Sequence, residues 1–110
     1  MGGSARGVVS KGMSFKVTIR SRAREDIRET RDWYEERSPN LAVRFGREID
    51  EVMLAIRDQP LIHAKIYLDI RRAMTRRFPY AIYFIIENGR IVVLRVLHQA
   101  RDPQEWRTSR

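Results

Sequence analysis

The chain has 110 residues, and its 22 Lys and Arg residues against 14 Asp and Glu residues give a formal net charge of +8. Its hydrophobic content of 43% suffices for one modest core, and the absence of cysteine excludes a disulfide scaffold and fits a reducing cytoplasm. The apolar run at residues 81–86 is far short of the roughly 18 residues that a membrane span needs, so we expect no membrane association.

The first 12 residues are rich in glycine and lack hydrophobic periodicity. They contain no apolar segment of the length that a secretory signal requires. We therefore expect residues 1–12 to be a disordered leader or an artificial arm. Met13 is then the expected natural start, and residues 13–110 form one domain.

A strand and a helix are predicted next. Residues 15–20 alternate between apolar and polar side chains, which is typical of a half-buried strand. Ser21 is a candidate N-cap, and apolar residues then recur at helical spacing as far as Tyr34.

The sequence around residues 37–40 ends this helix and begins a second one. Ser38 is a candidate N-cap and Pro39 a favourable first helical residue, and apolar residues then form one stripe over residues 41–56 before Gln59 and Pro60. Because the link is so short, the two helices are predicted to form an antiparallel hairpin.

The second half of the chain indicates strands over residues 70–77, 80–87 and 90–98. Asn88-Gly89 favours a two-residue hairpin turn, because both turn positions require positive φ. The resulting register pairs Glu87 with Arg90, Ile85 with Val92, Tyr83 with Leu94, and Ala81 with Val96. We predict that this face packs under the helices and that the opposite face, which carries Arg95, is partly open.

The end of the chain predicts a short helix. Asp102-Pro103-Gln104-Glu105 has the pattern of a capping box, and Trp106 is positioned to anchor the helix. The predicted fold class is therefore α+β: an N-terminal strand, an antiparallel α-hairpin, a three-stranded antiparallel sheet and a short C-terminal helix.

The positive charge is concentrated outside the two long helices. Residues 59–110 hold ten basic and four acidic residues, whereas residues 22–37 and 40–58 each have a net charge of −1. Arginine offers a planar fork of donors suited to phosphate or carboxylate. A basic sheet face would suit a nucleic-acid backbone or an acidic protein segment, although salt bridges to the acidic helices are an alternative. The candidate target-binding residues are Arg72, Arg76, Arg77, Arg95 and Arg101.

Metal and cofactor sites are not indicated. His63 and His98 lie far apart and belong to no ligand-spaced cluster, and no glycine-rich phosphate loop is present. We therefore expect neither a metal nor a cofactor.

A catalytic interpretation is available for four residues. Metal-free RNA cleavage needs a base, an acid and cations that stabilise the developing phosphorane charge. His98, Arg101, Arg95 and Tyr80 have these chemical properties. The alternative is structural: His98 would hydrogen-bond to the adjacent turn or terminal helix, and Arg101 would pair with an acid. Residue types alone favour the structural alternative.

Several segments together resemble a known family. They are Ala23–Ile27, Asp32–Tyr34, Leu41–Phe45, Ile70–Arg72, Arg77–Tyr80 and Val96–Pro103 followed by Trp106. Their order and spacing resemble the ParE branch of the RelE/ParE toxin superfamily over about residues 14–107. The most specific part is Arg-Phe-Pro-Tyr followed by His-x-x-Arg-Asp-Pro-x-x-Trp.

This resemblance implies a toxin of a type II toxin–antitoxin module, a group often called plasmid stabilisation proteins. A cognate antitoxin with an amphipathic, often acidic segment would neutralise it. ParE-type members poison DNA gyrase, whereas RelE-type members cleave mRNA on the ribosome with basic residues and a C-terminal Tyr or His.

Two departures from the RelE pattern favour the ParE reading. The RelE pattern has an arginine just after the tyrosine that opens the third strand, and Ala81 stands there in this chain. The C-terminal tyrosine is also missing, with Trp106 near the end instead. We therefore favour a gyrase inhibitor without chemistry of its own. The alternatives are a ribosome-dependent endoribonuclease, which His98 and Arg101 would serve, and a degenerate member that only binds an antitoxin.

Overall fold

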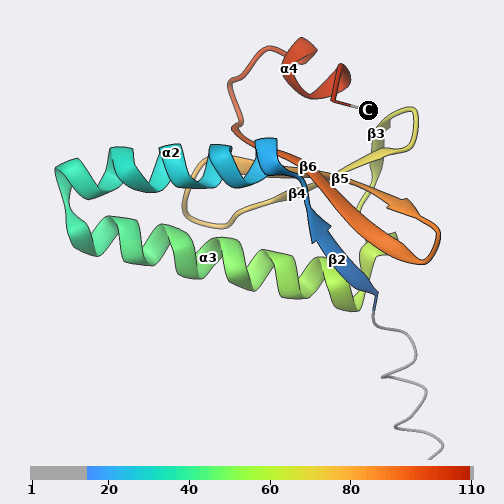
Figure 1. Cartoon of the computed structure of the whole chain (residues 1–110), viewed down its shortest axis with the longest axis horizontal. Helices are drawn as coiled ribbons and strands as arrows, with labels where there is room; N and C mark the ends of the chain where they lie inside the picture. Colours follow the sequence, from blue (N-terminus) through green and yellow to red (C-terminus); the bar gives the residue numbers. More distant parts are fainter. Residues whose placement is uncertain (1–14, 110) are drawn as a thin grey trace, which may run out of the picture.

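The computed structural model describes residues 15–109 and shows the predicted α+β fold, with a helical hairpin packed against a sheet (Figure 1). The elements in chain order are β2 (Lys16–Ile19), α2 (Ser21–Arg37), α3 (Pro39–Asp58), η1 (Pro60–Ile62), β3 (Lys65–Tyr67), β4 (Ile70–Met74), β5 (Tyr80–Glu87), β6 (Arg90–His98) and α4 (Gln104–Arg107). Within residues 15–109, no helix combines the length and apolar character that crossing a membrane requires. The predicted leader and Met13 lie outside the described residues.

The helical hairpin forms where the sequence predicts it, but the N-cap of its first helix differs. Arg20, rather than Ser21, is the N-cap of α2, because its backbone is still extended and its N–H donates to the carbonyl of Val93 in β6. Ser38 is the N-cap of α3 and Pro39 is the first helical residue, but no side-chain capping bond forms. The hairpin is therefore held mainly by its apolar stripe against the sheet.

The sheet has five strands in the order β2-β6-β5-β4-β3. β2 pairs with β6 in parallel, and the remaining neighbours are antiparallel. Two predictions need correction here. β3 is an additional strand, and the Arg-rich strand ends at Met74 rather than at residue 77.

The chain leaves the sheet after Met74 because Thr75 closes a turn. The Thr75 hydroxyl hydrogen-bonds with the carbonyl of Phe78, and its backbone N–H donates to the carbonyl of Tyr80 at 2.9 Å. Arg76 and Arg77 consequently lie in the β4–β5 loop, so the prediction that they alternate across a strand is wrong.

The predicted assignment of the sheet faces is inverted for most residues, although Val96 lies under the hairpin as predicted. The face under the hairpin contains the buried residues Ile82, Phe84, Ile91, Val93 and Val96, which pack with Phe45, Ile49, Val52 and Ile56 of α3. Ala81, Tyr83, Ile85, Val92 and Leu94, which we predicted under the helices, instead form a second core on the opposite face. Both faces are thus buried, and the prediction that one is partly open is wrong.

A bulge in β6 also changes the predicted register. The pairs Ile85–Val92 and Glu87–Arg90 are confirmed, but Phe84 then pairs with Val93 and Tyr83 with Arg95, so Leu94 is the extra residue. A bulge of this kind interrupts the two-residue alternation of a strand. The predicted pairs Tyr83–Leu94 and Ala81–Val96 are therefore wrong.

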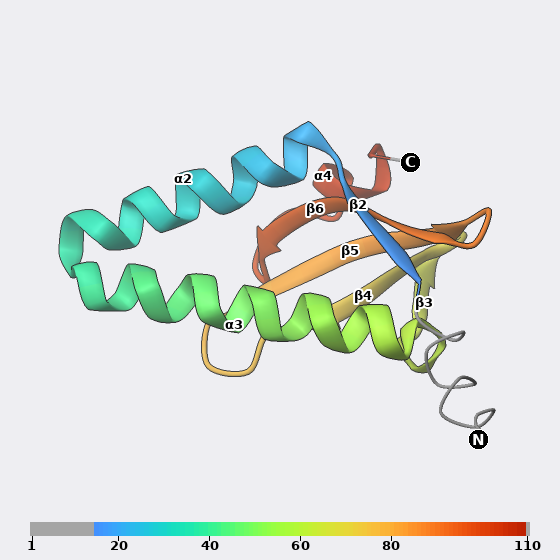
Figure 2. The ribbon, with the colours of Figure 1, turned by 60° about the horizontal axis from the view of Figure 1, so that its bottom comes forward.

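The C-terminal segment covers the second core. α4 lies on the side of the sheet away from α3 (Figure 2). Trp106 is buried and stacks on Tyr83, with ring centroids 5.0 Å apart and an interplanar angle of 12°, so its predicted anchoring role is confirmed. Asp102 accepts a hydrogen bond from the N–H of Gln104, but the Glu105 side chain is turned toward two arginines and does not complete the capping box.

Candidate functional site

The five candidate target-binding arginines do not share one surface. Arg72 lies on β4 opposite Tyr83, on the face away from the hairpin. Arg76 and Arg77 are exposed in the β4–β5 loop, and Arg101 is exposed after β6. Arg95 is buried, with an exposed fraction of 7%. The fold therefore separates the predicted basic face into local sites.

Arg95 joins three parts of the molecule. Its Nε and Nη2 donate to the two carboxylate oxygens of Asp26 in α2 at 2.8 and 3.0 Å, and its Nη1 donates to the carbonyl of Glu105 at 3.1 Å. Hydrogen bonding to Asp26 is the main reason that the pKa of Arg95 is raised. Because these bonds direct its donors inward, Arg95 is a structural residue in this geometry.

Tyr80, His98 and Arg101, three of the four candidate catalytic residues, line one cavity of about 400 Å³. The helical hairpin supplies the other walls through Glu29, Thr30, Trp33 and Tyr34 of α2. The sequence analysis did not identify these α2 residues. Local patterns do not indicate which turn of a helix packs beside the end of a strand some 50 residues later in the chain. We call this the Tyr80 cavity.

Local contacts already engage two members of the Tyr80 cavity. His98 Nδ1 accepts a hydrogen bond from the backbone N–H of Ala100 at 3.0 Å, and its ring lies 5.3 Å from that of Tyr80. In the neutral imidazole, this bond leaves the proton on Nε2. Arg101 lies 3.3 Å from the Glu105 carboxylate. Both contacts are those that a structural role predicts.

The Tyr80 cavity also contains a perturbed phenol. Burial is the main reason that the pKa of Tyr34 is raised, and the neighbouring Tyr80 adds to the effect. Tyr34 is therefore a neutral hydrogen-bonding group at physiological pH, suited to binding a ligand.

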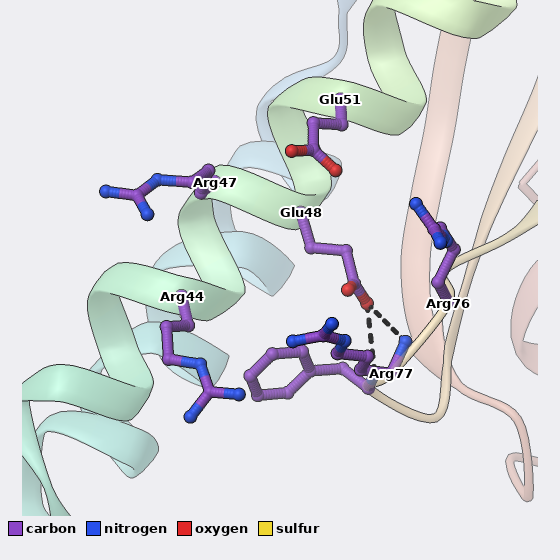
Figure 3. A pocket seen from close by; sticks show the side chains of 7 residues that line it. Arg44, Arg47, Glu48, Glu51, Arg76 and Arg77 are labelled. Atoms are coloured by element: carbon purple, nitrogen blue, oxygen red, sulfur yellow. Dashed lines mark hydrogen bonds between the residues drawn. The ribbon is translucent and has the colours of Figure 1, made fainter.

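A second pocket of about 200 Å³ lies between α3 and the β4–β5 loop (Figure 3). Its lining consists of Arg44, Arg47, Glu48, Glu51, Arg76, Arg77 and Phe78, and we call it the arginine pocket. The buried Glu48 carboxylate accepts hydrogen bonds from the backbone N–H groups of Arg77 at 2.8 Å and Phe78 at 3.0 Å. These bonds fix the loop against α3 and so set the position from which Arg76 and Arg77 extend.

A third, more apolar groove of about 650 Å³ runs between the edge strand β2 and α3. Phe15, Val17, Ile19, Met53 and Leu54 line it, with Lys16, Asp50 and Arg57 at the same groove. We call it the β2–α3 groove. Its position at a sheet edge beside a helix suits an amphipathic protein segment.

Residues 15–109 contain no group of three or more His, Asp or Glu side chains placed to hold a metal ion. His63 Nε2 is buried without a hydrogen-bond partner in this part of the chain, and the His63 ring lies edge-on to Phe84, with centroids 5.8 Å apart. The two histidines thus occupy separate environments.

Comparison with known proteins relates this architecture to one family. Residues 17–103 match the model of a family described as the ParE toxin of the type II toxin–antitoxin system parDE. Among solved structures, a chain of the chromosomal ParDE TA system from P. aeruginosa aligns with a TM-score of 0.70 and 18% identity. The alignment covers 78% of this chain and 97% of that chain, and at this identity it shows the shared fold. No curated protein matches the chain in sequence.

Proposed function

Since the chain belongs to the ParE toxin family of type II toxin–antitoxin systems, we propose that it binds and inhibits DNA gyrase and that a cognate antitoxin neutralises it in the cytoplasm. The observation that carries this proposal is the family match over residues 17–103, which include both long helices, β3 to β6 and all but the first residue of β2. The predicted membership of the RelE/ParE superfamily is confirmed by the same match.

The geometry of the Tyr80 cavity supports binding rather than RNA cleavage. Ala81, at the place where the ribonuclease pattern has an arginine, is fully buried in the second core. Arg95 is directed at Asp26. Among residues 15–109, Arg101 is therefore the one guanidinium that lines the cavity, and it already contacts Glu105. Phosphoryl chemistry without a metal depends on several cations around the reacting phosphate.

The direct test is a supercoiling assay with purified toxin and DNA gyrase. We expect loss of supercoiling or accumulation of cleaved complexes. Arg101→Ala should weaken the inhibition, because it removes an exposed charge beside the Tyr80 cavity, whereas Arg28→Ala removes an exposed charge from the middle of α2 and serves as the matched control. Supercoiling that continues unchanged in an excess of toxin would contradict the proposal.

A ribosome-dependent endoribonuclease is the second candidate function, and one observation favours it. Three candidate catalytic residues from distant parts of the chain meet in one cavity that also contains the Glu29 carboxylate. This function predicts cleaved mRNA in a translating lysate, with cleavage lost in His98→Ala and Arg101→Ala. Intact transcripts at doses that stop growth would exclude it. Normal growth of cells expressing the toxin alone would instead favour a degenerate member that only binds its antitoxin.

For the antitoxin, we propose docking at the β2–α3 groove through an amphipathic segment with acidic residues. The groove combines an exposed Leu54 with β2, which is an edge strand of the sheet formed by residues 15–109, so it offers apolar contacts and backbone hydrogen-bonding groups. Lys16 and Arg57 lie at the same groove and would attract acidic side chains.

A further inference from the structure

We propose that the arginine pocket binds successive phosphates of a DNA backbone. This contact would be additional to the protein target proposed above. The choice of DNA over other polyanions rests on that proposed function, because DNA gyrase acts on duplex DNA. The pocket itself is inferred from charge, geometry and burial.

The first argument is an excess of positive charge, since four arginines and two glutamates line the pocket. Arg44 and Arg47 come from α3, and Arg76 and Arg77 come from the β4–β5 loop. Within residues 15–109, none of the four forms an ion pair, although other exposed arginines do, such as Arg101 with Glu105 at 3.3 Å. The Glu48 and Glu51 carboxylates at the same pocket offset two of these four positive charges, and an external anion would offset the remaining two.

The second argument is that the scaffold of the pocket is fixed before any ligand arrives. Glu48 is 8% exposed, and its carboxylate is used by the two backbone N–H groups of the loop. Phe78 is buried and packs edge-on against Tyr34 and Phe45, with centroids 5.1 and 5.5 Å apart. The loop is thus held from both sides, and little ordering of its backbone is required on binding.

The third argument concerns the shape of the ligand. Arg44 and Arg77 extend on one side of Glu48, Arg76 extends on the other side, and Arg47 points away from the loop (Figure 3). Charges spread in this way suit several phosphates along a backbone better than one isolated phosphate. The aromatic ring at the pocket, Phe78, is buried in the core, so the pocket offers no exposed platform for stacking a base. The expected binding is therefore independent of sequence.

The test measures binding of a fluorescent DNA duplex to the toxin by anisotropy, in the absence of gyrase. Arg44→Ala/Arg77→Ala should weaken binding about tenfold at moderate salt and reduce the dependence of log K on log salt by about two, since each lost phosphate contact reduces it by about 0.9. Arg28→Ala/Arg90→Ala removes the same charge at exposed positions on α2 and the β5–β6 turn and should weaken binding less than about twofold.

A second variant distinguishes the effect of guanidinium geometry from the effect of positive charge. Arg44→Lys/Arg77→Lys keeps both charges, so it should retain most of the salt dependence while losing part of the affinity. Thermal melting of every variant checks that the substitution leaves the fold intact.

Three outcomes would overturn the proposal. The first is equal weakening by the pocket and control variants, which would indicate an effect of net charge alone. The second is that Arg44→Ala/Arg77→Ala loses binding to polyglutamate but binds DNA as the wild type does, which would indicate that the pocket binds an acidic protein. The third is tighter binding of single-stranded RNA than of duplex DNA. A failure of gyrase inhibition affects none of these measurements, so the two proposals fail separately.

Discussion

The ion pair between Arg95 and Asp26 is the principal buried charge in the described part of the molecule. Both side chains are less than one-tenth exposed, and Asp26 also accepts a hydrogen bond from the backbone N–H of Val96 at 3.0 Å. The Asp26 carboxylate therefore neutralises the Arg95 guanidinium. It also accepts a hydrogen bond from a backbone N–H of β6 beyond the end of β2. Removing one partner of such a pair leaves the other charged and desolvated.

We predict that Asp26→Ala lowers the free energy of unfolding by about 3–5 kcal/mol. The substitution leaves the buried Arg95 guanidinium without its counter-charge and the Val96 N–H without its acceptor. Urea unfolding measures the loss. The control is Glu25→Ala, which breaks the exposed pair with Arg22 and should change stability by less than about 1 kcal/mol. Equal losses in the two variants would contradict the buried role of Asp26.

His63 gives the second prediction at this scale. Burial, and then the positive charge of Arg71, lower the pKa of His63 in the folded protein. The folded state thus binds fewer protons than the unfolded state, so this contribution to stability is present above the unfolded pKa of about 6.5 and is lost as pH falls toward the folded pKa.

The free energy of unfolding should therefore decrease as pH is lowered below about 6.5, and His63→Leu should remove that part of the decrease. Urea unfolding measured from about pH 5 to about pH 8 checks this expectation. His98→Gln, at an exposed position, is the control and should leave the His63-dependent decrease unchanged. An identical pH profile for the wild type and His63→Leu would refute the assignment.

At the scale of elements, two glycines illustrate opposite backbone requirements. Gly46 lies inside α3, where a Cβ atom would meet Arg31 Cδ at 3.9 Å, an ordinary contact distance. Gly89 lies in the β5–β6 turn with φ of +74°, a conformation that side chains disfavour, although the space around it is open.

We predict opposite effects for alanine at these two positions. Gly46→Ala should stabilise the protein by up to about 1 kcal/mol because alanine favours helix, whereas Gly89→Ala should destabilise it by about 1–2 kcal/mol through backbone strain. The midpoints of urea unfolding report both effects. Changes of the same sign at both positions would show that the turn, the helix or both differ from the structure described.

The missed strand β3 shows a limit of sequence patterns for short elements. β3 and β4 are joined by Leu68 and Asp69, and Leu68 has a positive φ of 53°. This turn lacks the Asn-Gly chemistry that made the β5–β6 hairpin predictable. Pairing with β4 in the folded sheet therefore supports a conformation that leucine itself disfavours.

At the scale of the whole molecule, the net charge of +8 and the β2–α3 groove would act on different steps of the proposed antitoxin binding. Long-range attraction accelerates the encounter with an acidic partner and is screened by salt. Apolar contacts in the groove would act over short distances and would mainly determine how slowly the proposed complex dissociates.

We predict that the association rate constant with the cognate antitoxin falls at least about tenfold as salt is raised, which stopped-flow mixing would measure. Leu54→Asp should mainly accelerate dissociation, because it places a carboxylate in the β2–α3 groove. Leu61→Asp, at an exposed position in η1 outside the groove, is the matched control. Equal association rates at low and high salt would contradict the electrostatic step, and equal dissociation of both variants would contradict the docking site.

The sequence by itself determined the elements that local patterns specify. The α-hairpin, the β5–β6 turn and the anchoring role of Trp106 follow from periodicity, turn chemistry and an isolated large apolar side chain. The short motifs also sufficed to place the chain in its family, which the match over residues 17–103 confirms.

Only the tertiary structure decided which sheet face lies under the hairpin and which residues meet at the candidate sites. Both faces of β5 and β6 are apolar, so alternation separates them but does not say which one α3 covers. Arg95 suggested an open face because its compensating carboxylate lies 69 residues away in sequence. Long-range pairings such as this one, and that of Glu48 with the β4–β5 loop, depend on how elements pack, which local residue patterns do not encode.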